Sequence, residues 1–113
     1  MKQTHDRSRS LGELLKRELS RIIQREVSDK HIGMVTVTTV KASPDLRNAK
    51  IYVTFINETQ STAACVETLN QLVPFIRTHL AHDVNLRVTP QLKFYFDETL
   101  SRANRVLDMM NQT

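Results

Sequence analysis

The hydrophobic positions nearest the amino terminus follow the spacing of an amphipathic helix. Apolar residues recur three or four positions apart between Leu11 and Val27, and this spacing places them on one face of a helix. Ser8 and Ser10 precede the stripe, and serine hydroxyls accept the unpaired backbone N–H groups of a helix start. The pattern predicts a first helix that begins near Ser8 or Ser10 and ends before Gly33. Its apolar stripe consists of Leu11, Leu14, Leu15, Leu19, Ile22, Ile23 and Val27.

The next two runs alternate between apolar and polar residues, as the strands of a β-hairpin do. In MVTVTTVKA the alternation changes phase near Thr38 and Thr39, where a β-bulge would restore the facing. The connector SPDLRN is rich in turn-forming residues. In AKIYVTFI, Ile51 and Val53 fall on one face and Tyr52 on the other. The two runs therefore predict an antiparallel hairpin that is apolar on one face only.

A proline interrupts the second helix that the pattern predicts. Apolar residues between Val66 and Leu80 keep a helical spacing, and Ser61 or Thr62 can cap the start of this helix. Pro74 removes one hydrogen bond and crowds the preceding turn, which costs about 3 kcal/mol in a continuous helix. Proline is favoured in the first turn of a helix. The sequence therefore predicts a kink at Pro74 and a new helical segment that starts there.

The remaining pattern predicts a third strand and a final helix. In PQLKFYFD, Leu92 and Phe94 alternate with Lys93 and Tyr95, which is the period of a strand with one buried face. A final helix, capped by Asp97 or Thr99, would bury Leu100, Ala103, Val106, Leu107 and Met110.

The predicted order is helix, strand, strand, helix, kink, helix, strand, helix. This order indicates an α+β fold, a KH-like domain of type II with a three-stranded sheet and its helices packed on one face. We expect one domain that spans residues 1–113. KH domains bind RNA and ordinarily carry Gly-x-x-Gly at the kink, where the backbone clamps the nucleic acid. This chain has no such motif.

Charge and composition narrow the classes of partner and compartment. The chain has 16 Lys and Arg against 12 Asp and Glu, a net charge of +4 and a pI near 9.6, which favours polyanionic partners such as nucleic acid. Its single cysteine, Cys65, cannot form an internal disulfide and is expected in the core. The sequence shows no signal peptide and no apolar run of about 20 residues. We therefore expect a cytoplasmic protein without membrane contact.

Basic residues in three regions are candidates for RNA contact. On the first helix, arginines at positions 17, 21 and 25 form a line with i, i+4 spacing. Two more candidates lie in and after the SPDLRN connector, and another two, Arg77 and Arg87, could flank a phosphate groove. The one candidate that is not basic, Pro74, starts the post-kink helix, whose exposed N–H groups and positive dipole suit a phosphate. Solvated surface charge is the alternative reading for all of them. The candidates are Arg17, Arg21, Arg25, Arg47, Lys50, Pro74, Arg77 and Arg87.

Other chemistry receives little support from the sequence. Tyr52 and Tyr95 on the polar face of the sheet could stack on bases, or could pack on each other. His79, His82 and Asp83 have helical spacing but lack further ligands for a metal site. No Gly-rich phosphate loop, nucleophile elbow or metal-ligand cluster is present in the sequence. We therefore expect no enzymatic activity, no cofactor, no metal and no small-molecule substrate.

Two long stretches resemble a known family. They are LKRELSRIIQREVSDKHIGMVTVTTVKASPDLRNAKIYVTF and FIRTHLAHDVNLRVTPQLKFYFDETL, and in residue type, spacing and order they resemble the bacterial ribosome-binding factor A family. The resemblance spans nearly the whole chain. It implies a KH-like, monomeric assembly factor that binds the free small (30S) ribosomal subunit. It also implies a role in late maturation and 5′ processing of 16S rRNA, most important in the cold.

The chain departs from this family at the kink. The family carries Ala-x-Gly where this chain has Leu72, Val73 and Pro74, so the kink would be retained through proline. Bulky side chains there would keep RNA farther from the backbone than glycine permits. The alternatives to an assembly factor are a protein-interaction module that pairs through its sheet and a general binder of single-stranded RNA.

Overall fold

Three helices and three strands make up the part of the chain that the structure describes. The computed structural model describes residues 2–27, 32–56 and 58–99. The element order confirms the predicted α+β, KH-like fold as far as the third strand, and the predicted final helix lies outside the described residues. The elements are α1 (Lys2–Glu26), β1 (Met34–Ala42), β2 (Asn48–Ile56), α2 (Thr62–Gln71), α3 (Val73–Asp83) and β3 (Gln91–Phe96).

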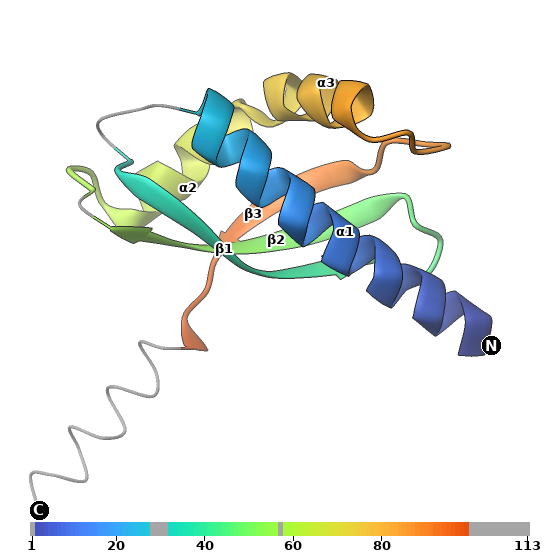
Figure 1. Ribbon diagram of the computed structural model, residues 1–113. Coiled ribbons are helices and arrows are strands. Elements are labelled where there is room, and N and C mark those ends of the chain that lie inside the picture. The colour runs from blue at the N-terminus through green and yellow to red at the C-terminus, as the bar shows by residue number, and fades with distance from the viewer. Residues whose placement is uncertain (1, 28–31, 57, 100–113) are drawn as a thin grey trace, which may run out of the picture.

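The strands form one sheet in the order β1-β2-β3. β1 and β2 pair antiparallel, and β3 adds to β2 in parallel. The register shifts between Val37 and Thr39, which confirms the bulge predicted near Thr38. The three helices lie on one face of the sheet (Figure 1). No described helix covers the other face, which we call the open face.

The hairpin turn is held by the side chains that the connector supplies. The Ser43 hydroxyl accepts a hydrogen bond from the Asn48 N–H at 3.1 Å, and the Asp45 carboxylate accepts one from the Arg47 N–H at 3.1 Å. Leu46 occupies the left-handed region with φ of 62°, a conformation that favours glycine or asparagine. Turn chemistry therefore positions the start of β2 despite an unfavourable residue within the turn.

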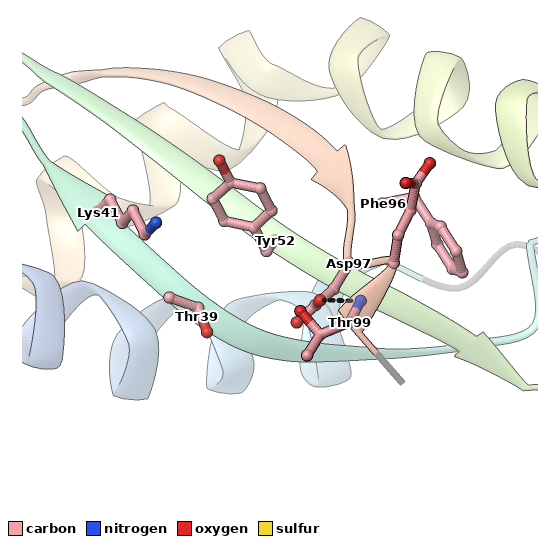
Figure 2. Close-up of a pocket in the computed structure, with 7 residues that line it drawn as sticks. Thr39, Lys41, Tyr52, Phe96, Asp97 and Thr99 are labelled. Carbon is pink, nitrogen blue, oxygen red and sulfur yellow. Dashed lines mark hydrogen bonds between the residues drawn. The ribbon is translucent and has the colours of Figure 1, made fainter. Parts of the chain in front are cut away.

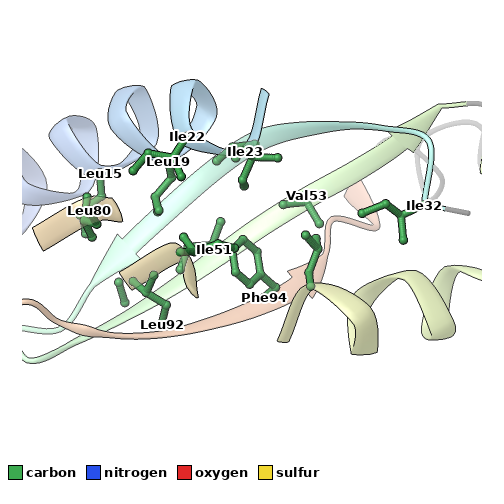
Figure 3. Packing of buried hydrophobic residues seen from close by; sticks show 14 of the residues in the cluster. Leu15, Leu19, Ile22, Ile23, Ile32, Ile51, Val53, Leu80, Leu92 and Phe94 are labelled. Atoms are coloured by element: carbon green, nitrogen blue, oxygen red, sulfur yellow. The ribbon is translucent and has the colours of Figure 1, made fainter. Parts of the chain in front are cut away.

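The core lies between the helices and the covered face of the sheet. Leu15, Leu19 and Ile22 of α1 are fully buried in one cluster with Ile51 and Val53 of β2 (Figure 3). The apolar face of α1 and the apolar face of the sheet therefore form one layer, as the spacing of apolar residues in both predicts. The other buried apolar residues are Ile23, Ile32, Val37, Ala49, Cys65, Leu69, Ile76, Leu80, Leu92 and Phe94.

The first helix begins earlier than its apolar stripe predicts. We expected a start near Ser8 or Ser10, and this prediction is wrong, because α1 begins at Lys2. The added turns extend past the sheet (Figure 1), and their sequence, KQTHDRSRS, has no apolar stripe whose spacing could predict a helix. The segment before Leu11 contains neither proline nor glycine, and nothing in it stops a helix.

A break of one residue separates α2 from α3. Ser61 caps α2 by accepting the Ala64 N–H at 3.2 Å. Leu72, with φ −88° and ψ 0°, ends α2, and α3 begins at Val73 with Pro74 in its first turn. The predicted kink is confirmed, but the residue that leaves helical geometry is Leu72, two positions before the proline.

Gly12 allows α1 to approach β1 closely. A Cβ atom at this position would lie 2.8 Å from the backbone oxygen of Val40. We expect Gly12→Ala to lower the free energy of unfolding by up to about 2 kcal/mol, because overpacking costs about 1–3 kcal/mol while the gain in helix propensity is only about 1 kcal/mol. Urea unfolding measures the change, with Glu13→Ala on the exposed side as the control. An alanine variant more stable than the wild type would contradict this contact.

Candidate nucleic-acid interface

The arginine line on α1 divides into two exposed residues and one structural residue. Arg17 and Arg21 have side chains 66% and 62% exposed, and Glu18 lies 3.8 Å from each. Arg25 instead bonds to Asp83 of α3 at 2.8 Å and to Glu26 at 2.7 Å. The hydrogen bonds with these two carboxylates, the one with Asp83 first, raise the pKa of Arg25. Arg25 therefore links α1 to α3, whereas Arg17 and Arg21 remain candidates for RNA contact.

A second group of candidates gathers at one end of the sheet. The Arg47 carbonyl accepts a hydrogen bond from the Gln91 N–H at 2.8 Å, which places the hairpin turn beside the start of β3. Arg87 is exposed on the segment that leads into β3. Arg77 of α3 reaches the same segment and donates from Nε to the Pro90 carbonyl and from Nη2 to the Thr89 carbonyl, each at 2.9 Å. Residues distant in sequence thus meet at this end.

The contacts of Arg77 give it a structural role that the sequence does not reveal. Its partner carbonyls lie 12 and 13 residues away, and no local pattern marks a backbone carbonyl as an acceptor for a side chain. The two bonds hold the segment before β3 against α3. Its predicted contact with RNA stays a prediction, because two of its donors already serve the fold.

Separate substitutions of Arg77 and Arg87 should show that only Arg77 stabilises the fold. We expect Arg77→Ala to lower the free energy of unfolding by about 1–3 kcal/mol, because two hydrogen bonds from a charged donor are lost. Arg87→Ala should change it by less than about 0.5 kcal/mol, as is usual for an exposed side chain. Arg77→Lys should recover only part of the loss, because an ammonium lacks the planar fork. Chemical denaturation provides the measurement, and equal small changes in Arg77→Ala and Arg87→Ala would contradict the assignment.

Lys50 lies on the open face of the sheet, in a row of lysines. It pairs in register with Lys41 of β1 and with Lys93 of β3. The next residues on this face, Tyr52 and Tyr95, are stacked with ring centroids 5.6 Å apart. This contact confirms the reading in which the two tyrosines pack on each other.

A hollow lies beside Tyr52 near the end of β3 (Figure 2). The Asp97 carboxylate accepts hydrogen bonds from the Thr38 hydroxyl and from the Thr99 N–H, the latter at 2.9 Å. These bonds, the one from Thr38 first, lower the pKa of Asp97. Asp97 thus binds the backbone N–H of Thr99, and the final helix that Asp97 or Thr99 is predicted to cap lies outside the described residues. The hollow is lined by Thr39, Lys41, Tyr52, Phe96, Asp97, Glu98 and Thr99.

The histidines of α3 are engaged in pairwise contacts. His79 Nε2 lies 3.8 Å from Glu26, and His82 Nδ1 lies 3.2 Å from Asp83. Among the residues that the structure describes, no three side chains of metal-ligating type come together. None of the described helices has the length and apolar character needed to cross a bilayer.

The predicted contact residues do not form one surface. Arg17 and Arg21 lie on the exposed side of α1, whereas Arg47 and Arg87 lie at one end of the sheet. Lys50 lies on the open face of the sheet, opposite the helices. Pro74 is exposed in the first turn of α3, where Leu72 provides no side-chain cap.

Several known proteins are similar to this chain in sequence and in fold. A family model described as Ribosome-binding factor A matches residues 7–110. The chain is 40% identical over 112 residues to a ribosome-binding factor A of Nitrosococcus oceani, covering 99% of this chain and 88% of that protein. It is similar to the crystal structure of ribosome-binding factor A from Thermus thermophilus, with a TM-score of 0.68 and 26% identity over 78% of this chain and 93% of that one. It is also similar to a homology model of the Thermus thermophilus factor fitted into a cryo-EM map of its 30S complex, with a TM-score of 0.65 and 27% identity over 76% of this chain and 90% of that one.

Proposed function

The chain belongs to the ribosome-binding factor A family, and we propose that it binds the free small ribosomal subunit as an assembly factor. The observation that carries the proposal is the family match over residues 7–110, together with the similarity to a relative fitted into a map of a 30S complex. The net charge of +4 suits an RNA-rich partner.

In finer detail, the factor assists late maturation of 16S rRNA, including processing of its 5′ end, and matters most in the cold. It acts in the cytoplasm as a monomer and needs no catalytic group. Its exposed basic side chains contact phosphates and favour one arrangement of the folded RNA, because a ligand shifts an equilibrium toward the state that it binds more tightly. Among the predicted contacts, the exposed arginines that do not link one helix to another are Arg17, Arg21, Arg47 and Arg87.

Sedimentation with small subunits tests the binding. The wild-type chain should travel with free small subunits at low salt and leave them as the salt concentration rises, because phosphate contacts release counterions. Binding that is indifferent to salt would favour a protein-interaction module. Equal affinity for any RNA oligonucleotide would favour a general single-strand binder.

A depletion experiment tests the role in maturation. Cells that lack the protein should accumulate 16S rRNA with an unprocessed 5′ end, more strongly at low temperature than at the optimum. Complementation with the wild-type gene is the control. Normal 5′ ends at both temperatures would remove RNA processing from the proposal while leaving subunit binding intact.

A further inference from the structure

The open face of the sheet carries a row of three lysines in strand register. Lys41, Lys50 and Lys93 are direct neighbours on β1, β2 and β3. Adjacent strands lie about 4.8 Å apart, so the row spans roughly 10 Å across the sheet. Like charges directly opposite each other on neighbouring strands are destabilising. The fold therefore tolerates a repulsive arrangement that an anionic partner would relieve.

The two outer lysines of this row contact the tyrosine pair. Lys41 Nζ lies 5.6 Å from the ring centroid of Tyr52, and Lys93 Nζ lies 5.4 Å from that of Tyr95. Each lysine thus leans over one ring of the stacked pair, at a distance where a cation is attracted to the ring face. The result is a band of two cations and two flat rings, with Lys50 in register between the cations.

The two ends of the band differ in charge. Lys41 and Tyr52 line the same hollow as Asp97 and Glu98, and these two carboxylates repel phosphate at that end of the band. Lys50 lies on the other side of the tyrosine row, away from the hollow, because it precedes Tyr52 by two residues on the same face of β2. The three described helices all lie on the opposite face (Figure 1).

We propose that this open face binds a strand of RNA. Lys41, Lys50 and Lys93 contact its phosphates, and the Tyr52–Tyr95 pair packs against its sugars or bases, since aromatic side chains beside basic ones suit single-stranded RNA. The proposal rests on the proposed function, to which it adds a contact surface on the side of the sheet opposite the kink.

A charge-matched pair of triple variants of the full chain tests the open face. The first carries Lys41→Thr, Lys50→Thr and Lys93→Thr, because threonine suits a strand. The second carries Arg7→Gln, Arg9→Gln and Lys16→Gln, three exposed positions of α1 with the same loss of charge. Affinity for small subunits is measured at several salt concentrations, and thermal unfolding is measured for both variants.

The first variant should bind small subunits about tenfold or more weakly than the wild type. The slope of the logarithm of its binding constant against the logarithm of the salt concentration should be shallower by about 2, because three phosphate contacts are lost. Its melting temperature should stay close to that of the wild type, because the loss of lysine repulsion offsets the loss of the contacts that Lys41 and Lys93 make with the tyrosine rings. The second variant should lose much less affinity. Equal losses in the two variants, unchanged binding by the first, or a loss without change in salt dependence would each overturn the proposal.

Tyrosine fluorescence provides a second readout. The chain has no tryptophan and only two tyrosines, so intrinsic emission reports on the Tyr52–Tyr95 pair alone. Titration with a 16S rRNA transcript should change this emission in the wild type and in the α1 variant, but not in the lysine variant. A wild-type chain that shifts the RNA in a gel with unchanged emission would overturn the proposal.

These outcomes separate the two levels of inference. A wild-type chain that does not bind small subunits would overturn the proposed function and this proposal with it. Wild-type binding that the lysine variant retains in full would overturn only the open-face contact.

Discussion

Replacement of Asn70 with alanine is expected to lower the free energy of unfolding by about 2–4 kcal/mol. Asn70 Nδ2 donates to the Phe94 carbonyl at 3.1 Å, and its Oδ1 accepts the Phe94 N–H at 2.8 Å. β3 is an edge strand of the described sheet, so this side chain pairs with the backbone as another strand would. Its removal leaves a partly buried donor and acceptor without partners, which costs more than a solvated bond.

Urea unfolding and hydrogen exchange at the Phe94 amide measure this effect. Gln71→Ala at the adjacent exposed position is the matched control and should leave stability within about 0.5 kcal/mol of the wild type. Asn70→Asp should not rescue the loss, because a carboxylate oxygen would face the Phe94 carbonyl where the amide donor now lies. An aspartate variant as stable as the wild type would show that only the bond to the Phe94 N–H matters.

Replacement of Ile76 with alanine is expected to lower the free energy of unfolding by about 2–5 kcal/mol, as for other large buried aliphatic side chains. Ile76 is 0% exposed, as is Leu80 one turn further on, and together they fix α3 in the core. Pro74→Ala should cost only about 0.4–1 kcal/mol, through the greater freedom of the unfolded chain. The packing of α3 in the core therefore contributes more than Pro74 to the break between α2 and α3.

The conformation of the Pro74→Ala variant distinguishes these causes. From the sequence alone, removal of the proline should straighten the helix. From the contacts, the break at Leu72 should persist, because Asn70 fixes the end of α2 to β3 and Ile76 fixes the first turns of α3. Backbone chemical shifts of residues 70–76 report the outcome. A bond from the new N–H at position 74 to the Asn70 carbonyl would show that proline alone maintains the kink.

The sequence identified the types of residue in the candidate interface better than their arrangement. It selected exposed arginines and Lys50, and it placed Tyr52 and Tyr95 on the polar face. It did not reveal that Arg25 and Arg77 are engaged with Asp83 and with backbone carbonyls. A basic side chain has the same local pattern whether its partner is a phosphate or a distant part of its own chain.

The sequence by itself determined the three described helices apart from the start of α1, the hairpin, the bulge and the presence of a helix break, because these features depend on local periodicity, capping and turn chemistry. Only the tertiary structure decided that β3 adds in parallel to β2, that Asn70 covers the β3 edge, and that Lys50 stands between two other lysines. Those features depend on the register between segments far apart in the chain. Register is fixed when the apolar faces pack together, and no single segment encodes it.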